Sequence, residues 1–167
     1  MRKELKKTRF VVLMGLFIAM SVVGGYIKVP NPITSSIAFD SLPAFLATLV
    51  LGGVPGAIVG FLGHMASSGI GGFPLSLPIH LFIGVQMALI MFAFDFANRK
   101  LNITFSIIIG IILNGVVAPA CFILIPGQGM ATFMYLLVPL IFASTLNIIL
   151  AALIFRGIKN TSIVKEF

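Results

Sequence analysis

Long runs of apolar residues, broken by short clusters of proline, glycine and asparagine, make up most of this chain. A helix needs about 20 apolar residues to cross the hydrocarbon core of a bilayer. The runs therefore predict an all-α integral membrane protein, a six-transmembrane-helix bundle forming a single membrane domain over residues 1–167. The predicted helices cover residues 9–27, 39–51, 55–67, 79–97, 103–125 and 131–155.

The connections between these runs are predicted from their proline and glycine content. Residues 28–36 and 68–78 are predicted to be loops, and residues 52–56 and 126–129 tight turns. The second and third helices are short, so we expect them to tilt or to cross the bilayer only in part.

Composition supports lipid as the solvent for much of this chain. Hydrophobic residues make up 59% of the sequence, the mean hydropathy is +1.18, and only 9% of residues are charged. Soluble domains have about 25% charged residues. Such a chain has too few polar side chains to cover its surface in water.

The net charge of +7 comes from basic residues that cluster at the predicted helix ends. This placement is typical of topology signals and lipid-headgroup contacts, and argues against nucleic-acid binding. It puts a basic N-terminal segment, residues 1–8, and a C-terminal tail, residues 158–167, in the cytoplasm, and leaves Lys28 alone among the outer loops. The inner basic residues are Arg2, Lys3, Lys6, Lys7, Arg9, Arg99, Lys100, Arg156, Lys159 and Lys165.

Polar side chains gather in the half of the membrane that this topology places outside. Such groups are costly in lipid and are usually functional, so the pattern predicts a ligand site open to the outside. We expect Phe39 or Phe73 to cover the apolar face of a bound molecule, because the chain has no tryptophan. The candidate polar contacts are Asp40, His64, His80, Gln86, Asn114 and Tyr135.

Several of these polar residues have a structural alternative. Asp40 could cap the helix that follows it, and His64, which continues a stripe of glycines at positions 52, 56 and 60, could bond to a neighbouring helix. Asn147 is expected to hold helices together rather than to contact a ligand. Asp95 is expected to form an ion pair with Arg99, four residues later on the same helix face.

Motifs for catalysis and for energy coupling are absent from the sequence. There is no G-x-x-x-x-G-K-[ST] phosphate loop, no H-E-x-x-H and no G-x-S-x-G. The acidic and basic residues form no evident catalytic set, Cys121 stands alone, and no metal or other cofactor is expected. The chain is therefore predicted not to be an enzyme, and to bind a solute without an energy source of its own.

Two adjoining stretches, Ile37-Ala-Phe-Asp-Ser-Leu-Pro-Ala-Phe-Leu-Ala and Leu51-Gly-Gly-Val-Pro-Gly-Ala-Ile-Val-Gly-Phe-Leu-Gly-His, carry a resemblance to a known family. The chain resembles the substrate-binding S components of energy-coupling factor (ECF) vitamin transporters over nearly its whole length. The resemblance implies a place in the bacterial cytoplasmic membrane and three partners, a transmembrane T component and two cytoplasmic ATPases, that power uptake.

The resemblance also implies a docking motif in the first helix. The family carries a small-x-x-x-small pattern there that contacts the T component, and Gly15-Leu-Phe-Ile-Ala19 matches it, with glycine in place of the first alanine. Ordinary helix packing within the chain is the alternative.

The substrate is indicated only by one loop. Gly72-Phe-Pro-Leu-Ser-Leu-Pro-Ile-His80 is similar to members linked with α-ribazole or other cobalamin-related compounds, and with pantothenate. We take the first class as the leading hypothesis. A membrane enzyme and a self-contained carrier or channel are the rival functions.

Overall fold

The computed structural model describes residues 2–31, 35–161 and 164. Residue 1 of the predicted N-terminal segment, and residues 162, 163 and 165–167 of the predicted tail, lie outside the described residues. The helices are α1 (Arg2–Tyr26), α2 (Leu42–Leu51), α3 (Gly53–Ile70), α4 (Leu77–Lys100), α5 (Ile103–Ile112), α6 (Ala118–Ala120) and α7 (Gly129–Ile158). A π-helical turn, η1 (Leu113–Val117), joins α5 to α6, and a 3₁₀ turn, η2 (Cys121–Leu124), follows α6.

The predicted all-α bundle of six helices is confirmed across these ranges, with α5, η1, α6 and η2 together forming the fifth helix. Among the described residues, four segments are long and apolar enough to cross a bilayer: Lys7–Tyr26, Leu77–Lys100, Ile103–Leu124 and Gly129–Ile158. The ten residues of α2 rise only about 15 Å, half of a hydrocarbon core. This short helix therefore crosses only part of the membrane.

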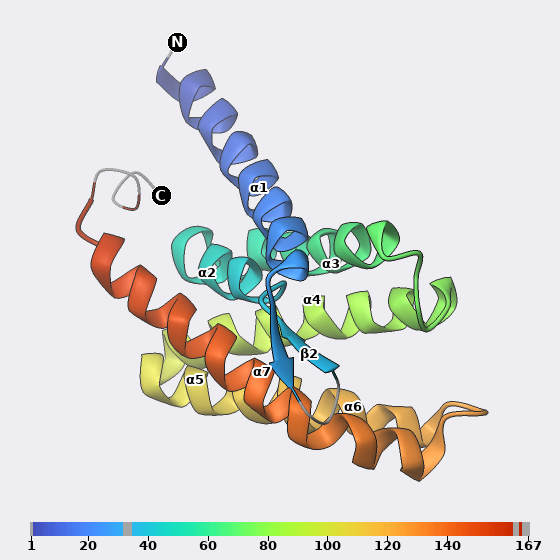
Figure 1. Ribbon diagram of the computed structural model, residues 1–167. Helices are drawn as coiled ribbons and strands as arrows, with labels where there is room; N and C mark the ends of the chain where they lie inside the picture. Colours follow the sequence, from blue (N-terminus) through green and yellow to red (C-terminus); the bar gives the residue numbers. More distant parts are fainter. Residues whose placement is uncertain (1, 32–34, 162–163, 165–167) are drawn as a thin grey trace.

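The short helix α2 is enclosed by its neighbours. It contacts α1, α3, α4 and α7. Figure 1 shows α1 meeting α2 and α3, with α4, α5 and α7 below them in this view. Every residue from Pro43 to Val50 is buried. A helix that is apolar all round has no face suited to water, so it occupies the centre of the bundle.

Aromatic and aliphatic side chains from α2, α4 and α7 fill the core. The rings of Phe45 and Phe94 meet edge to face with their centroids 5.1 Å apart. Met91 and Ile148 are fully buried around them. This packing fixes α2 against α4 and α7 and leaves the start of α2 free to line a cavity.

A single glycine makes the reversal between α2 and α3. Gly52 has φ +95°, a backbone conformation that glycine adopts without steric cost, so α3 begins at once with Gly53. The predicted five-residue turn over 52–56 is therefore wrong. The predicted ion pair beside this reversal is confirmed, with Arg99 Nε 2.9 Å from Asp95 Oδ2.

A β-hairpin replaces the loop predicted over residues 28–36. Strands β1 (Lys28–Asn31) and β2 (Ser35–Ala38) pair antiparallel, with Val29 opposite Ile37. The two prolines and the asparagine favour a loop in sequence, but a proline is tolerated in an edge strand whose N–H faces away from its partner. The hairpin connects α1 to the start of α2.

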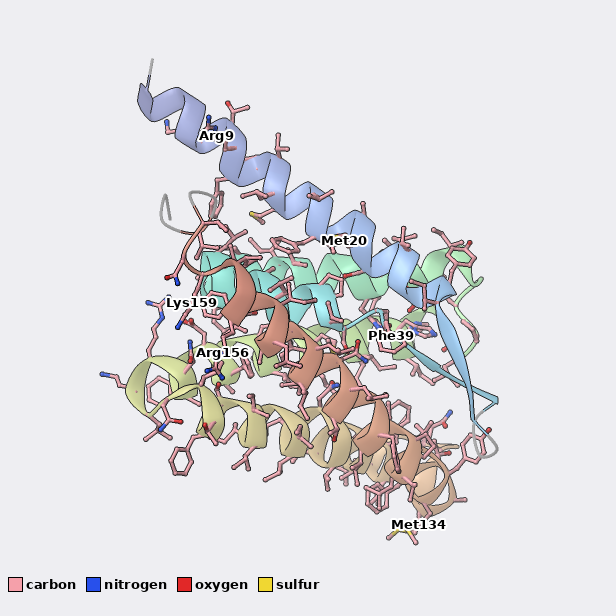
Figure 2. All side chains as sticks on the ribbon, turned by 60° about the vertical axis from the view of Figure 1, so that its left-hand side comes forward. Arg9, Met20, Phe39, Met134, Arg156 and Lys159 are labelled. Carbon is pink, nitrogen blue, oxygen red and sulfur yellow. The ribbon has the colours of Figure 1, made fainter. Side chains whose placement is uncertain are left out.

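Basic side chains gather at the end of the bundle opposite the hairpin. Figure 2 shows Arg9, Arg156 and Lys159 at one end, and Phe39 and Met134 at the other. The turn between α4 and α5 lies at the basic end (Figure 1). The molecule therefore has one basic end and one end formed by the hairpin and the starts of α4 and α7.

Candidate functional site

A cavity of about 260 Å³ lies between the start of α2, α3, α4, the turns around α6, and α7. It occupies the half of the bundle away from the basic end, since it is bordered by the early residues of α4 and α7. Apolar side chains such as Met87, Leu136 and Leu140 form much of its wall. Its polar lining residues are Asp40, Ser41, His64, His80, Gln86, Asn114 and Asn147.

Five of the predicted contact residues lie in this lining: Asp40, His64, His80, Gln86 and Asn114. Three others, Phe39, Phe73 and Tyr135, do not. Tyr135 is 56% exposed on α7. The Phe39 N–H donates to Gly24 O at 3.0 Å, which ties this residue to the end of α1. These three residues were named from residue type and from their place in the outer half of the predicted topology, neither of which determines whether a side chain lines the cavity.

A pair of histidines joins α3 to α4 at the edge of the cavity. His64 Nε2 lies 3.1 Å from His80 Nδ1, and Ser68 Oγ lies 3.3 Å from the same His64 nitrogen. On the far side of the pair, the Leu75 N–H donates to His80 Nε2 at 3.3 Å. Each histidine of the pair thus has a second partner: the Ser68 hydroxyl for His64 and the Leu75 backbone amide for His80.

The ring of Phe73 packs against His80, one member of this pair. Its ring centroid lies 5.7 Å from that of His80, and its ring also packs over Gly69. The residue has φ +51°, an uncommon conformation for a bulky side chain, and its N–H donates to Ser68 O at 2.8 Å. Phe73 therefore positions His80 rather than lining the cavity.

The π-helical turn η1 shapes the opposite wall. Pro119 has no N–H to donate to the preceding turn, and the Ala118 N–H reaches back five residues to Leu113 O. At this point the Gln86 Nε2 donates to Ala118 O at 3.2 Å. A carbonyl only accepts, so this bond fixes the orientation of the Gln86 amide.

Gln86 has an oxygen without a partner. Within the described part of the chain, Gln86 Oε1 is the single buried side-chain polar atom that makes no hydrogen bond. An unsatisfied buried acceptor is unfavourable, and native proteins rarely keep one without a reason. In a residue that lines a cavity, such an acceptor is suited to a ligand donor.

Two asparagines tie α7 to its neighbours. Asn114 Nδ2 donates to Ser144 Oγ at 2.9 Å, and the Leu42 N–H donates to Asn147 Oδ1 at 3.0 Å. Asn147 therefore satisfies an N–H in the first turn of α2. This agrees with the structural role predicted for Asn147, but the residue also lines the cavity. Its small neighbours in sequence indicated helix packing and hid that position.

Asp40 lies just before α2 and is partly buried. Burial of its carboxyl raises the pKa, and hydrogen bonds from the backbone N–H groups of Asp40 and Ser41 oppose this shift only in part. The capping role considered for Asp40 is wrong. The N-cap of α2 is Ser41, which makes no side-chain capping bond, and the acceptor in the first turn comes from Asn147. Ser41 was missed because no sequence pattern distinguished it.

The predicted docking motif lies on an open face of α1. Gly15 and Ala19 are both exposed, and a Cβ atom added at Gly15 would have no neighbour within 4 Å. The buried face of α1 is a different one, formed by Phe17, Ser21 and Gly24. Packing inside the described chain therefore does not explain the small residue at position 15.

One comparison with known proteins gives a match. The family model described as "ECF transporter, substrate-specific component" matches residues 9–158, nearly the whole chain. No curated protein and no solved structure matches it.

Proposed function

Because the chain belongs to the family of ECF transporter substrate-specific components, we propose that its cavity captures a vitamin or vitamin precursor from outside the cell. The protein is thus a multi-pass membrane subunit of a transporter and not an enzyme. Delivery inward would need a transmembrane T component and two cytoplasmic ATPases, since the sequence has no phosphate-binding loop.

The observation that carries this proposal is the half-polar cavity in the part of the bundle away from the basic residues. In bacterial membranes the basic ends of helices face the cytoplasm. The start of α1, the turn after α4 and the end of α7 would then be cytoplasmic, and the hairpin and the cavity would face outward. An outward-facing cavity suits a subunit that collects its ligand before transport.

α-Ribazole or a related cobalamin precursor is our first candidate for the substrate. Its support is the resemblance of residues 72–80 to members linked with such compounds, together with the position of Leu75 and His80 in the cavity lining. Pantothenate is the alternative that the same resemblance allows. A cavity of about 260 Å³ is near the lower limit for small-molecule sites, which favours a compact ligand for either class.

Reconstitution tests this function against its rivals. The purified chain should bind its ligand alone, but should import it into proteoliposomes only with a T component, two ATPases and ATP. Import by the chain alone would indicate a self-contained carrier, and conversion of the ligand would indicate an enzyme. Failure to co-purify with any T component from a host that carries one would contradict the proposal.

A further inference from the structure

The charge of the cavity lining restricts what it can bind. Among its described lining residues there is no lysine and no arginine, and Asp40 is the one carboxylate. The labelled basic side chains Arg9, Arg156 and Lys159 lie at the opposite end of the bundle (Figure 2). A bound anion would therefore meet no fixed positive charge from these residues.

The histidine pair does not supply a positive charge either. The Leu75 N–H donates to His80 Nε2, so that nitrogen carries no proton and His80 is neutral. The proton of His80 must then be on Nδ1, which faces His64 Nε2 at 3.1 Å. A cationic His64 would place a second N–H against it. Both rings are therefore neutral.

This arrangement leaves one donor and one acceptor without a hydrogen-bond partner on two of the lining residues. With Nε2 of His64 accepting, the proton of that ring lies on Nδ1, which makes no hydrogen bond to any described residue. On the other wall, Gln86 Oε1 is buried without a donor. His64 and Gln86 come from different helices, and both residues line the same cavity.

From this pattern, and resting on the proposed function, we propose that the cavity selects a ligand that carries no negative charge. The ligand accepts a hydrogen bond from His64 Nδ1, donates one to Gln86 Oε1, and places its apolar part against Met87, Leu136 and Leu140. An anion such as pantothenate would be buried without a countercharge and beside Asp40, which is unfavourable. A nucleoside-like neutral molecule meets all three requirements.

Matched pairs of small molecules test this selectivity. The probes are α-ribazole and its 5′-phosphate, pantothenol and pantothenate, and nicotinamide and nicotinate, each measured by calorimetry with the purified full-length protein in nanodiscs. We expect at least one neutral member to bind, and to bind at least about 10-fold more tightly than its anionic partner. Equal or tighter binding of the anion in any pair that binds would overturn the inference, as would binding of no neutral probe.

Two variants that change the charge of the lining test the same selectivity, so that the test still holds if one of them fails to fold. Asp40→Asn should narrow the neutral-over-anion ratio, because it removes the negative group of the lining. Gln86→Lys should favour the anionic member, because it adds a positive charge there. Lys28→Gln, which removes the one basic residue predicted in an outer loop, should leave the ratio unchanged. An unchanged neutral-over-anion ratio in both Asp40→Asn and Gln86→Lys, or a changed ratio in Lys28→Gln, would overturn the inference.

The proposed function and this inference fail in distinguishable ways. Co-purification with a T component and two ATPases needs no ligand, so its failure would count against the function alone. If the module assembles but the carboxylate or phosphate probe binds as tightly as its neutral partner, the function stands and the charge selectivity is wrong.

Discussion

His64 and His80, sixteen residues apart in the chain, face each other across α3 and α4 with Nε2 of the first 3.1 Å from Nδ1 of the second. The Leu75 amide orients this contact by donating to His80. The loop between the two helices thus determines which nitrogen carries the proton in each ring. Nδ1 of His64 is then the one ring nitrogen of the pair that makes no hydrogen bond within the described residues.

The hydrogen bond from His80 to His64 predicts unequal roles for the two histidines in ligand binding. His64→Ala removes the donor proposed to contact the ligand, and we expect binding to weaken by about 5- to 150-fold, as for a lost bond of about 1–3 kcal/mol. His80→Ala should weaken binding less, since it only frees His64 to change tautomer. Calorimetry with the tightest-binding probe measures both, and Asn98→Ala, near the other end of α4, serves as control.

An equal loss of affinity in both histidine variants would indicate that the pair acts as one structural unit. Unchanged affinity in His64→Ala would move the binding site away from α3.

Gln86 and Gln128, the two glutamines of the chain, form a matched comparison. Gln86→Met removes the buried acceptor and should weaken ligand binding by about 5- to 150-fold. Gln128→Met removes a side chain that bonds to Thr132 in the turn before α7, outside the cavity lining, and should leave affinity unchanged. Binding isotherms of the two variants decide whether Oε1 is a ligand contact. Equal affinities in both would contradict that role.

The elements that the sequence predicted well are those controlled by apolar run length. The long apolar runs form α4, the fifth helix over residues 103–124 and α7, and each ends within a few residues of the predicted positions. Five of the seven polar lining residues were also named from sequence, because a histidine or amide inside an apolar run has few explanations in lipid. The hydrophobic pattern was therefore enough for the helices of the bundle.

The features that the sequence did not predict depend on contacts between distant segments. The capping of α2 by Asn147 joins residues 105 positions apart, and no local pattern reports it. The hairpin was hidden because Pro30 favours a loop. Tyr135 was named from its position in the outer half of the membrane, which does not determine whether its side chain lines the cavity. The tautomer of His64 follows only once Leu75 is known to lie against His80.

Asp40 predicts a pH dependence of stability. Its pKa is raised in the folded state from an ordinary value of 3.8, so the folded protein binds more protons than the unfolded chain above that pH. Stability from this group is then full below about pH 3.8 and is lost as pH rises through the folded pKa, by up to about 1.4 kcal/mol per unit. Asp40→Asn should lack this loss.

Melting temperatures measured from pH 4 to pH 8 in nanodiscs test this. The melting temperature of Asp40→Asn relative to that of the wild type should increase as pH rises. A constant difference, or one that favours the wild type at pH 8, would show that the carboxylate is better solvated or paired than its burial indicates.

The proposed topology predicts which positions react from outside. In a Cys121→Ala background, single cysteines at Gly71 and Gln128 should react with a membrane-impermeant maleimide on intact cells. Cysteines at Asn98 and Asn160 should react only after the membrane is opened, because these positions adjoin Arg99 and Lys159 and basic residues favour the cytoplasmic side. Labelling of position 98 from outside would reverse the orientation.

The open face of α1 predicts a separation between ligand binding and coupling. Gly15 is exposed, and a Cβ atom added there meets no neighbour within 4 Å in the described chain, so Gly15→Leu should leave folding and ligand affinity unchanged. In the same way, Ala19→Leu enlarges an exposed position. Both should reduce assembly with the T component, because small residues allow two helices to approach closely and a longer side chain holds them apart. Met20→Leu, exposed at another angle round the same helix, is the matched control and should assemble normally.

Co-purification of tagged variants with the T component and the two ATPases, followed by uptake into proteoliposomes, measures the effect. Loss of assembly in all three variants would indicate a general disturbance of α1 rather than a specific contact. Normal assembly and uptake in both Gly15→Leu and Ala19→Leu would assign this face to lipid, and the docking surface would then have to lie on another helix. Reduced assembly in these two alone, with ligand affinity intact, is the result that a docking face on α1 requires, since no residue of α1 is among the described residues that line the cavity.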